Sequence, residues 1–128
     1  MLLASVVCAT ALTLKTTSAS LRAPAAVVHD FLATPANWPS IVLSSWSVEG
    51  DVSSPAEVGS SVDEIFGAPP VLPLRVSWSC ASTDRDRGAL KFVSEDGLPG
   101  VASNCVMEFA VIAQGVDAST VDASTSRR

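Results

Sequence analysis

The sequence predicts a single domain of the α+β class. Its 128 residues set a prior of one domain. Two short helical stretches lie near the N-terminus, and the later segments alternate apolar and polar residues between closely spaced turns. No amphipathic helix pattern follows those alternating segments. We therefore expect helices early in the chain and an antiparallel sheet after them.

Composition argues against several classes of function. Hydrophobic residues make up 48% of the chain, enough for a core, and the formal charge is −5. The eight Lys and Arg residues are scattered, so no basic stripe exists to bind nucleic acid. No apolar run approaches the roughly 20 residues of a membrane-spanning helix. One histidine, three distant cysteines and no phosphate-binding or dinucleotide motif predict neither a metal site nor a cofactor.

Residues 1–13 form an apolar opening that admits two interpretations. An Ala-Thr-Ala pattern at 9–11 is typical of a secretory cleavage site, and the scarcity of acids also suits an organelle transit peptide. The positively charged start of a secretory signal is missing, so the alternative is a first strand or a disordered N-terminus. The compartment stays open between these targets and a soluble intracellular location.

The first elements are a strand over 14–22 and two helices. Pro24 suits the start of a helix over 25–32, in which Val27, Val28, Phe31 and Leu32 form the expected buried stripe. A second short helix is expected over 36–43, limited by Pro39, with Trp38 and Ile41 on one face.

Alternation then predicts a series of antiparallel strands. The clearest covers 72–80, and others are expected around 46–48, 60–66, 89–94 and 104–111, with a last one around 116–121. The sequence Val-Asp-Ala-Ser-Thr occurs twice in tandem, at 116–120 and 121–125. We expect residues 123–128 to be a disordered tail.

The stretch from Arg22 to Ile41 resembles the opening of the START-like (SRPBCC) superfamily, which includes Bet v 1-type, polyketide cyclase/dehydrase and lipid-transport proteins. The resembling features are Ala-Pro-Ala-Ala-Val, the Trp38-Pro39 segment and the later Val58-Gly59-Ser60 turn. The resemblance covers about 14–122 and implies a helix-grip fold, a curved antiparallel sheet that encloses an apolar cavity together with helices.

One departure from that family is large. Its long C-terminal helix, which closes the cavity, has no counterpart after Val121. Either the domain is truncated or something else closes the cavity. An uncovered inner face of the sheet would favour a protein partner or a homodimer.

The apolar faces of the predicted elements supply the candidate ligand-binding residues. In a helix-grip fold these faces would point toward the helices or a ligand, whereas the alternative is that they only build the core. The candidates are Trp38, Trp46, Phe66, Val76, Trp78, Phe92, Met107 and Phe109.

Glu64 is the one candidate acid or base. If Val62 and Phe66 face inward, Glu64 lies between them as a desolvated carboxyl with a raised pKa. If the other face is buried, Glu64 is ordinary surface, and this is the interpretation that the rarity of buried acids favours. We expect His29 to lie on the surface, because it is off the Val27 and Phe31 stripe.

These observations favour binding of a small hydrophobic ligand, such as a lipid, isoprenoid or polyketide, without catalysis. The ligand class comes from the resemblance. The alternatives are an enzyme of the polyketide cyclase or dehydratase type, with Glu64 as acid or base, and an interaction module that uses an uncovered sheet face.

Overall fold

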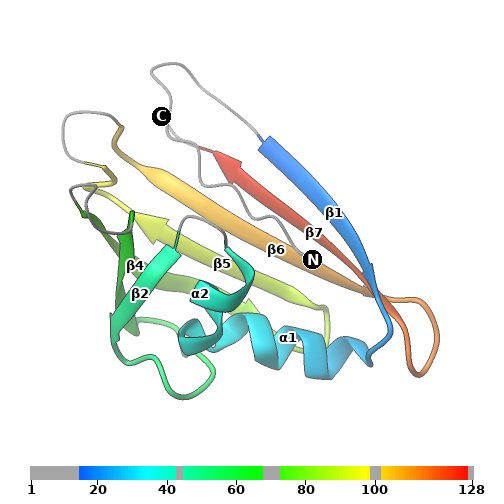
Figure 1. The fold of residues 1–128 in the computed structure, drawn as a ribbon. Helices are drawn as coiled ribbons and strands as arrows, with labels where there is room; N and C mark the ends of the chain where they lie inside the picture. The colour runs from blue at the N-terminus through cyan, green and yellow to red at the C-terminus, as the bar shows by residue number, and fades with distance from the viewer. Residues whose placement is uncertain (1–14, 43–44, 68–72, 99–101, 127–128) are drawn as a thin grey trace.

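The computed structural model describes residues 15–42, 45–67, 73–98 and 102–126. Within these ranges the chain forms an antiparallel sheet of seven strands and two short α-helices (Figure 1). In chain order the elements are β1 (Lys15–Leu21), α1 (Ala25–Ala33), the 3-10 turn η1 (Pro35–Asn37), α2 (Trp38–Ile41), β2 (Ser45–Gly50), β3 (Ser61–Phe66), β4 (Leu74–Asp84), β5 (Ala89–Ser94), β6 (Cys105–Ala113) and β7 (Ser119–Ser126).

The sheet brings the two ends of the described chain together. Its strand order is β1-β7-β6-β5-β4-β3-β2, so β2 to β7 form a meander and β1 adds antiparallel to β7. Figure 1 shows the sheet curving around α1 and α2, which lie on the same side of it. This side is called the inner face below. The predicted α+β helix-grip architecture is confirmed.

Alternation along each strand sorts its side chains between the two faces. In β3 the burial pattern places Val62, Glu64 and Phe66 inward, and the same period of two runs through β4, β5 and β6. The helices contribute to the same core, since the Trp38 ring meets the Phe92 ring edge-on with centroids 4.9 Å apart. One contiguous core therefore joins the sheet to the helices.

The inner face is for the most part not the exposed apolar patch that one of the two alternatives implied. Most inward side chains of β3 to β7 are buried, from 0% exposed at Val121 to 9% at Phe66, whereas Leu74 at the start of β4 is 47% exposed. The curved sheet turns these side chains toward one another and toward α1 and α2. No helix follows β7 in the part of the chain that the structure describes. Of the two alternatives that the sequence left open, the burial of these side chains therefore favours a face that is covered in another way.

The buried face of α1 differs from the predicted stripe. Val28, His29, Leu32 and Ala33 are buried, whereas Val27 is 55% and Phe31 42% exposed. The predicted stripe had apolar residues at i, i+1, i+4 and i+5, which is wide enough to be rotated by one residue. The helix is rotated so that Val28 and Leu32 are buried as predicted. His29 and Ala33 are buried in place of Val27 and Phe31.

The second helix and the last strand also have different bounds from those predicted. The expected helix over 36–43 is split into η1 and α2, with Pro35 and Pro39 each at the start of a turn. β7 runs from Ser119 to Ser126 rather than 116–121. The expectation of disorder was thus wrong for 123–126, and the expected segment 1–13 and residues 127–128 lie outside the described residues. Among the described helices, none has the length and apolar character needed to cross a membrane.

Candidate functional site

Seven of the eight predicted ligand-binding residues lie together in the core. Trp38 comes from α2 and the other six from the inner faces of four strands: Phe66, Val76, Trp78, Phe92, Met107 and Phe109. Trp46 does not join them. It lies at the irregular register step between Ser45 and Ser47 in β2 and is 57% exposed. The position of the other seven residues in the core suits packing and ligand contact equally, so their role in ligand binding stays a prediction.

Glu64 lies on the inner face, contrary to the surface position that the sequence favoured. It pairs with Val76 across β3 and β4, and its inward neighbours on β3 are Val62 and Phe66. Its side chain is 1% exposed. The prediction relied on the rarity of buried acids. In a strand, however, residues two positions apart face the same side, so Glu64 points inward with Val62 and Phe66 whatever its own polarity. The alternative that the sequence also offered, a desolvated carboxyl, is the one found.

The local geometry explains how this carboxyl is kept on an apolar face. Trp78 is the next inward residue of β4 after Val76 and pairs with Val62 of β3. Its indole Nε1 donates to Glu64 Oε2 at 3.0 Å. Burial raises the pKa of Glu64 from 4.5 to about 7, and this exceeds the lowering of the pKa by Ser45 and Trp78. Glu64 therefore has a proton that can be gained or lost near neutral pH.

Ser45 is a part of this site that the sequence did not reveal. Its hydroxyl lies close enough to lower the pKa of the Glu64 carboxyl. Its Oγ is nevertheless buried without a hydrogen bond of good geometry. We take the two groups as neighbours that are not tightly bonded. No pattern in the sequence singles out Ser45, since its proximity depends on the pairing of β2 with β3.

His29 is buried, which corrects the expectation of a surface histidine. Its Nε2 lies 3.0 Å from the backbone oxygen of Ala89 at the start of β5, while its Nδ1 has no hydrogen-bond partner. The adjacent Asp30 binds Arg85 in the β4–β5 turn, through Nε at 2.8 Å and a second nitrogen at 3.0 Å. These contacts attach α1 to the β4–β5 hairpin, so His29 acts as a structural link here.

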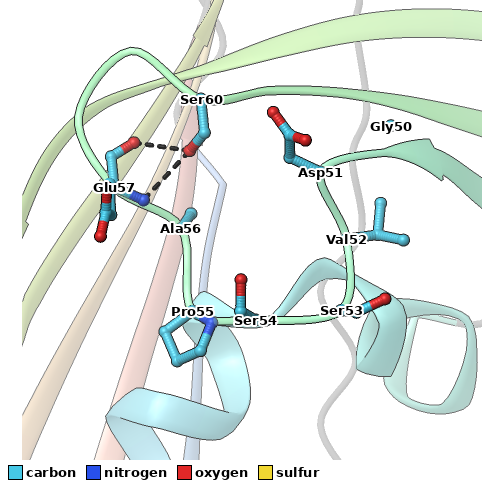
Figure 2. Close-up of a pocket in the computed structure, with 9 residues that line it drawn as sticks. All are labelled: Gly50, Asp51, Val52, Ser53, Ser54, Pro55, Ala56, Glu57 and Ser60. Carbon is cyan, nitrogen blue, oxygen red and sulfur yellow. Dashed lines mark hydrogen bonds between the residues drawn. The ribbon is translucent and has the colours of Figure 1, made fainter.

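Two hollows that the described residues line open mainly away from the inner face. One, of about 400 Å³, lies in the β2–β3 loop. Figure 2 shows its lining residues, among which the Ser60 hydroxyl turns back onto the backbone of Glu57. The carboxylates of Asp51 and Glu57 do not converge in it. A second, of about 520 Å³, lies on the outer side of β5, β6 and β7 and includes Phe109 among its lining residues.

The chemistry available at the inner face is accordingly narrow. Within the described ranges, no three His, Cys, Asp or Glu residues are placed to hold a metal ion. Glu64, Ser45 and the Trp78 indole are instead polar groups on a mainly apolar wall. Such a wall can bind an apolar molecule, and its carboxyl can exchange one hydrogen bond or one proton with that molecule.

Comparison with known proteins places the fold. The chain matches no protein-family profile, and no curated protein is detectably similar in sequence. Solved structures are similar. The Zhui aromatase/cyclase from a Streptomyces species has a TM-score of 0.74 at 13% identity, over 92% of this chain and 68% of that one. The major latex-like protein 151 of Panax ginseng has a TM-score of 0.71 at 15% identity, over 91% of this chain and 79% of that one.

Two further matches extend the range of functions within the same fold. Truncated norcoclaurine synthase from Thalictrum flavum has a TM-score of 0.68 at 18% identity, over 92% of this chain and 76% of that one. The di-domain ARO/CYC BexL has a TM-score of 0.69 at 17% identity, over 91% of this chain, and the chain spans 36% of its length. At these identities the comparisons establish the fold. The protein therefore has a START-like, helix-grip fold, the fold of Bet v 1-like proteins and polyketide aromatase/cyclases.

Proposed function

We propose that this protein binds a small, mainly hydrophobic ligand between the inner face of the sheet and the helices α1 and α2. The observation that carries the proposal is the position of Glu64. Among the described residues it is the one buried carboxyl, and it lies on an apolar, aromatic wall. A domain that needed only a core would be more stable with an apolar residue there, because burying a carboxyl costs free energy.

The chemistry of the wall suggests the kind of ligand. Trp78 and Phe92 offer aromatic surface, and the Glu64 carboxyl offers one polar contact. A small aromatic molecule with a hydroxyl or carbonyl group would match both. A protein of the same fold, norcoclaurine synthase, has been crystallised with dopamine and hydroxybenzaldehyde. These two molecules are convenient probes because they differ in charge while sharing a phenolic ring.

Thermal unfolding with and without these probes tests the proposal. We expect hydroxybenzaldehyde to raise the melting temperature, because a ligand at about 100 times its Kd stabilises the folded state by about 2.7 kcal/mol. Binding should be confirmed by NMR shifts in the Trp78 and Phe92 rings. Glu64→Gln tests whether the buried carboxyl takes part in binding, and its matched control is Glu57→Gln, which removes an exposed glutamate of the β2–β3 loop. Failure of a panel of apolar aromatic and aliphatic molecules to stabilise the protein would contradict the proposal.

The pKa of Glu64 favours a second candidate function, acid or base catalysis of the cyclase or dehydratase type. A carboxyl with a pKa of about 7 can accept and donate a proton at neutral pH. In this alternative, Glu64→Gln would still bind the ligand but turn it over about 10²–10⁴-fold more slowly. Equal behaviour of the parent and the variant, in binding and in turnover, would remove Glu64 from both candidate functions.

A further inference from the structure

Only one copy of the tandem repeat Val-Asp-Ala-Ser-Thr lies wholly in the sheet. The second copy, 121–125, lies within β7. Most of the first copy, from Val116 to Ala118, forms the turn between β6 and β7, and Val116 is 86% exposed. Val121, its equivalent in the second copy, is 0% exposed. Two identical pentapeptides therefore occupy opposite environments in adjacent positions.

The second copy has defined partners on both sides. On β6, Val121 pairs with Val111, Asp122 with Ala110, and Ala123 with Phe109. On β1, the corresponding pairs are with Ala19, Ser18 and Thr17. The outward Asp122 accepts a hydrogen bond from the Ser18 hydroxyl. Each residue of the copy thus has its own place in a three-strand ladder.

A shift of β7 by five residues would place the first copy on these same partners. Val116 would pair with Val111 and Asp117 with Ala110, and the remaining three residues would follow in the same order. Five is an odd number, so every residue of the strand would change faces. In an ordinary strand that change would bury polar groups. Here each incoming residue is identical to the one it replaces over the five positions of the repeat.

The connection to β6 permits this shift. In the present register the residues between the paired Ala113 and Ser119 are 114–118. In the shifted register the loop would be 112–115, a four-residue hairpin that ends in Gly115. Gly115 already has a φ of +117°, and a Cβ at its position would meet nothing within 4 Å. Four-residue loops are a common hairpin connection.

We infer that β7 has two registers: the one in the structure, and a minor one in which residues 116–120 replace 121–125 between β1 and β6. Residues outside the repeat make the described register the more stable one. It pairs Ile112 and Ala113 of β6 with β7 and buries Ser119, and the shifted register loses these contacts. The shifted strand would also turn Asp122 inward if it continued past Val121. These differences make the shifted register the less populated of the two.

The shift would change the sheet where α1 lies against it. α1 contacts β5, β6 and β7, and Ser119 and Leu21 pair at that end. In the minor register Leu21 would lose Ser119 as its partner, because the loop 112–115 would lie at that end, and the ends of β6 and β7 would be shorter. The minor register therefore loosens the support of α1 and leaves Glu64 unchanged, because three strands separate β3 from β7 in the sheet.

Lysine substitutions at the two equivalent valines test this inference. Val121→Lys places a charge in the core of the described register but on the outer face of the shifted one. Val116→Lys does the reverse. We expect Val116→Lys to leave the melting temperature unchanged, Val121→Lys to stay folded with reduced stability, and the double variant to lose cooperative unfolding. Complete unfolding of Val121→Lys, or additive effects in the double variant, would overturn the inference.

Cysteine pairs detect the shift in an otherwise native core. Ala110→Cys with Asp122→Cys pairs in the described register, and Ala110→Cys with Asp117→Cys pairs only in the shifted one. Ala110→Cys with Ala118→Cys pairs in neither and is the control, because Ala118 would point to the opposite face. Cross-linking in a glutathione buffer is read by peptide mass. We expect the 110–117 pair to form more slowly than 110–122 but at least tenfold faster than 110–118. Equal rates for 110–117 and 110–118 would overturn the inference.

Discussion

Glu64 keeps its inward position because its strand neighbours determine it. Val62 and Phe66 bury the same face of β3, and an alternating strand cannot turn one residue outward between them. The Trp78 indole supplies one hydrogen bond, and the rest of the cost appears as the raised pKa. At the residue scale the protein thus accepts a weakly compensated polar group, which is a common feature of functional sites.

The Glu64 carboxyl should make stability fall as the pH rises. Its pKa is about 7 in the folded protein against an ordinary 4.5, so the folded state binds the proton more tightly than the unfolded state. The stabilisation is fully present below pH 4.5 and is lost as the pH rises to about 7. Over this window the free energy of unfolding should fall by roughly 3 kcal/mol.

Chemical denaturation at several pH values measures this dependence. Glu64→Gln is the control, because the amide keeps the size of the side chain and does not titrate. We expect its curve to lack this decline, and Glu57→Gln to keep it. A decline of equal size in Glu64→Gln would show that another group is responsible.

At the scale of elements, α1 illustrates how a helix selects among possible faces. Its sequence offers an apolar stripe wide enough for two orientations, and the structure uses the one that buries His29 against β5. The ion pair of Asp30 with Arg85 lies beside this contact. Both residues of that pair are substantially exposed, so the pair orients the helix more than it stabilises the fold.

Alanine substitutions two positions apart on α1 test this orientation. We expect His29→Ala to destabilise by about 2–3 kcal/mol, because it leaves a cavity and removes the hydrogen bond to Ala89. Phe31→Ala should cost less than about 1 kcal/mol, since the ring is 42% exposed. The free energies of unfolding of the two variants decide between the faces. The reverse order would support the stripe that the sequence predicted.

The β4–β5 hairpin approaches β6 so closely that one position requires glycine. Gly88 has a φ of +70°, its backbone oxygen accepts a hydrogen bond from the Val111 nitrogen at 2.7 Å, and a Cβ there would lie 2.0 Å from the Val111 oxygen. Gly59 also has a positive φ, +91°, but a Cβ there would meet nothing within 4 Å. A substitution at Gly59 would therefore introduce backbone strain alone, whereas one at Gly88 would introduce both strain and a steric collision.

Gly88→Ala should accordingly be much more damaging than Gly59→Ala. Gly59→Ala should cost about 1–2 kcal/mol, the strain of a left-handed backbone. Gly88→Ala adds the collision with Val111 and should displace the β5–β6 ladder, which hydrogen exchange of the β5 amides would detect. Similar unfolding free energies for the two variants would show that the hairpin can move away from β6.

At the scale of the whole molecule, the helices are joined to the sheet through Trp38. Its ring is 1% exposed and meets Phe92, and its Nε1 donates to the Leu32 oxygen at 2.9 Å. It thus links α2 to α1 and both to β5. The pairing of β1 with β7 similarly joins the start of the described chain to its end, so the fold depends on contacts that are distant in sequence.

Trp38 and Trp46 should respond very differently to substitution. We expect Trp38→Ala to cost about 3–5 kcal/mol and to expose the inner face to a hydrophobic dye. Trp46→Ala should change the free energy of unfolding by less than about 1 kcal/mol, because that ring is 57% exposed. Denaturant unfolding of both variants makes the comparison. An equal cost would mean that Trp46 packs against the core more than its exposure indicates.

The sequence by itself determined the class, the order of elements and most of the core. Alternation identified the inward faces of β4, β5 and β6, because a half-buried strand imposes a period of two on its own residues. The START-like resemblance added the curvature of the sheet. These are local patterns, or patterns shared with known proteins, and a single chain suffices to show them.

Only the tertiary structure decided which groups meet. It selected the buried face of α1, placed Ser45 and Trp78 beside Glu64, and extended β7 through 123–126. Each of these outcomes depends on register or rotation between elements, where two arrangements satisfy the same local pattern. The free energy that distinguishes such arrangements comes from side-chain packing and desolvation across the sheet, and those contacts exist only once the chain has folded.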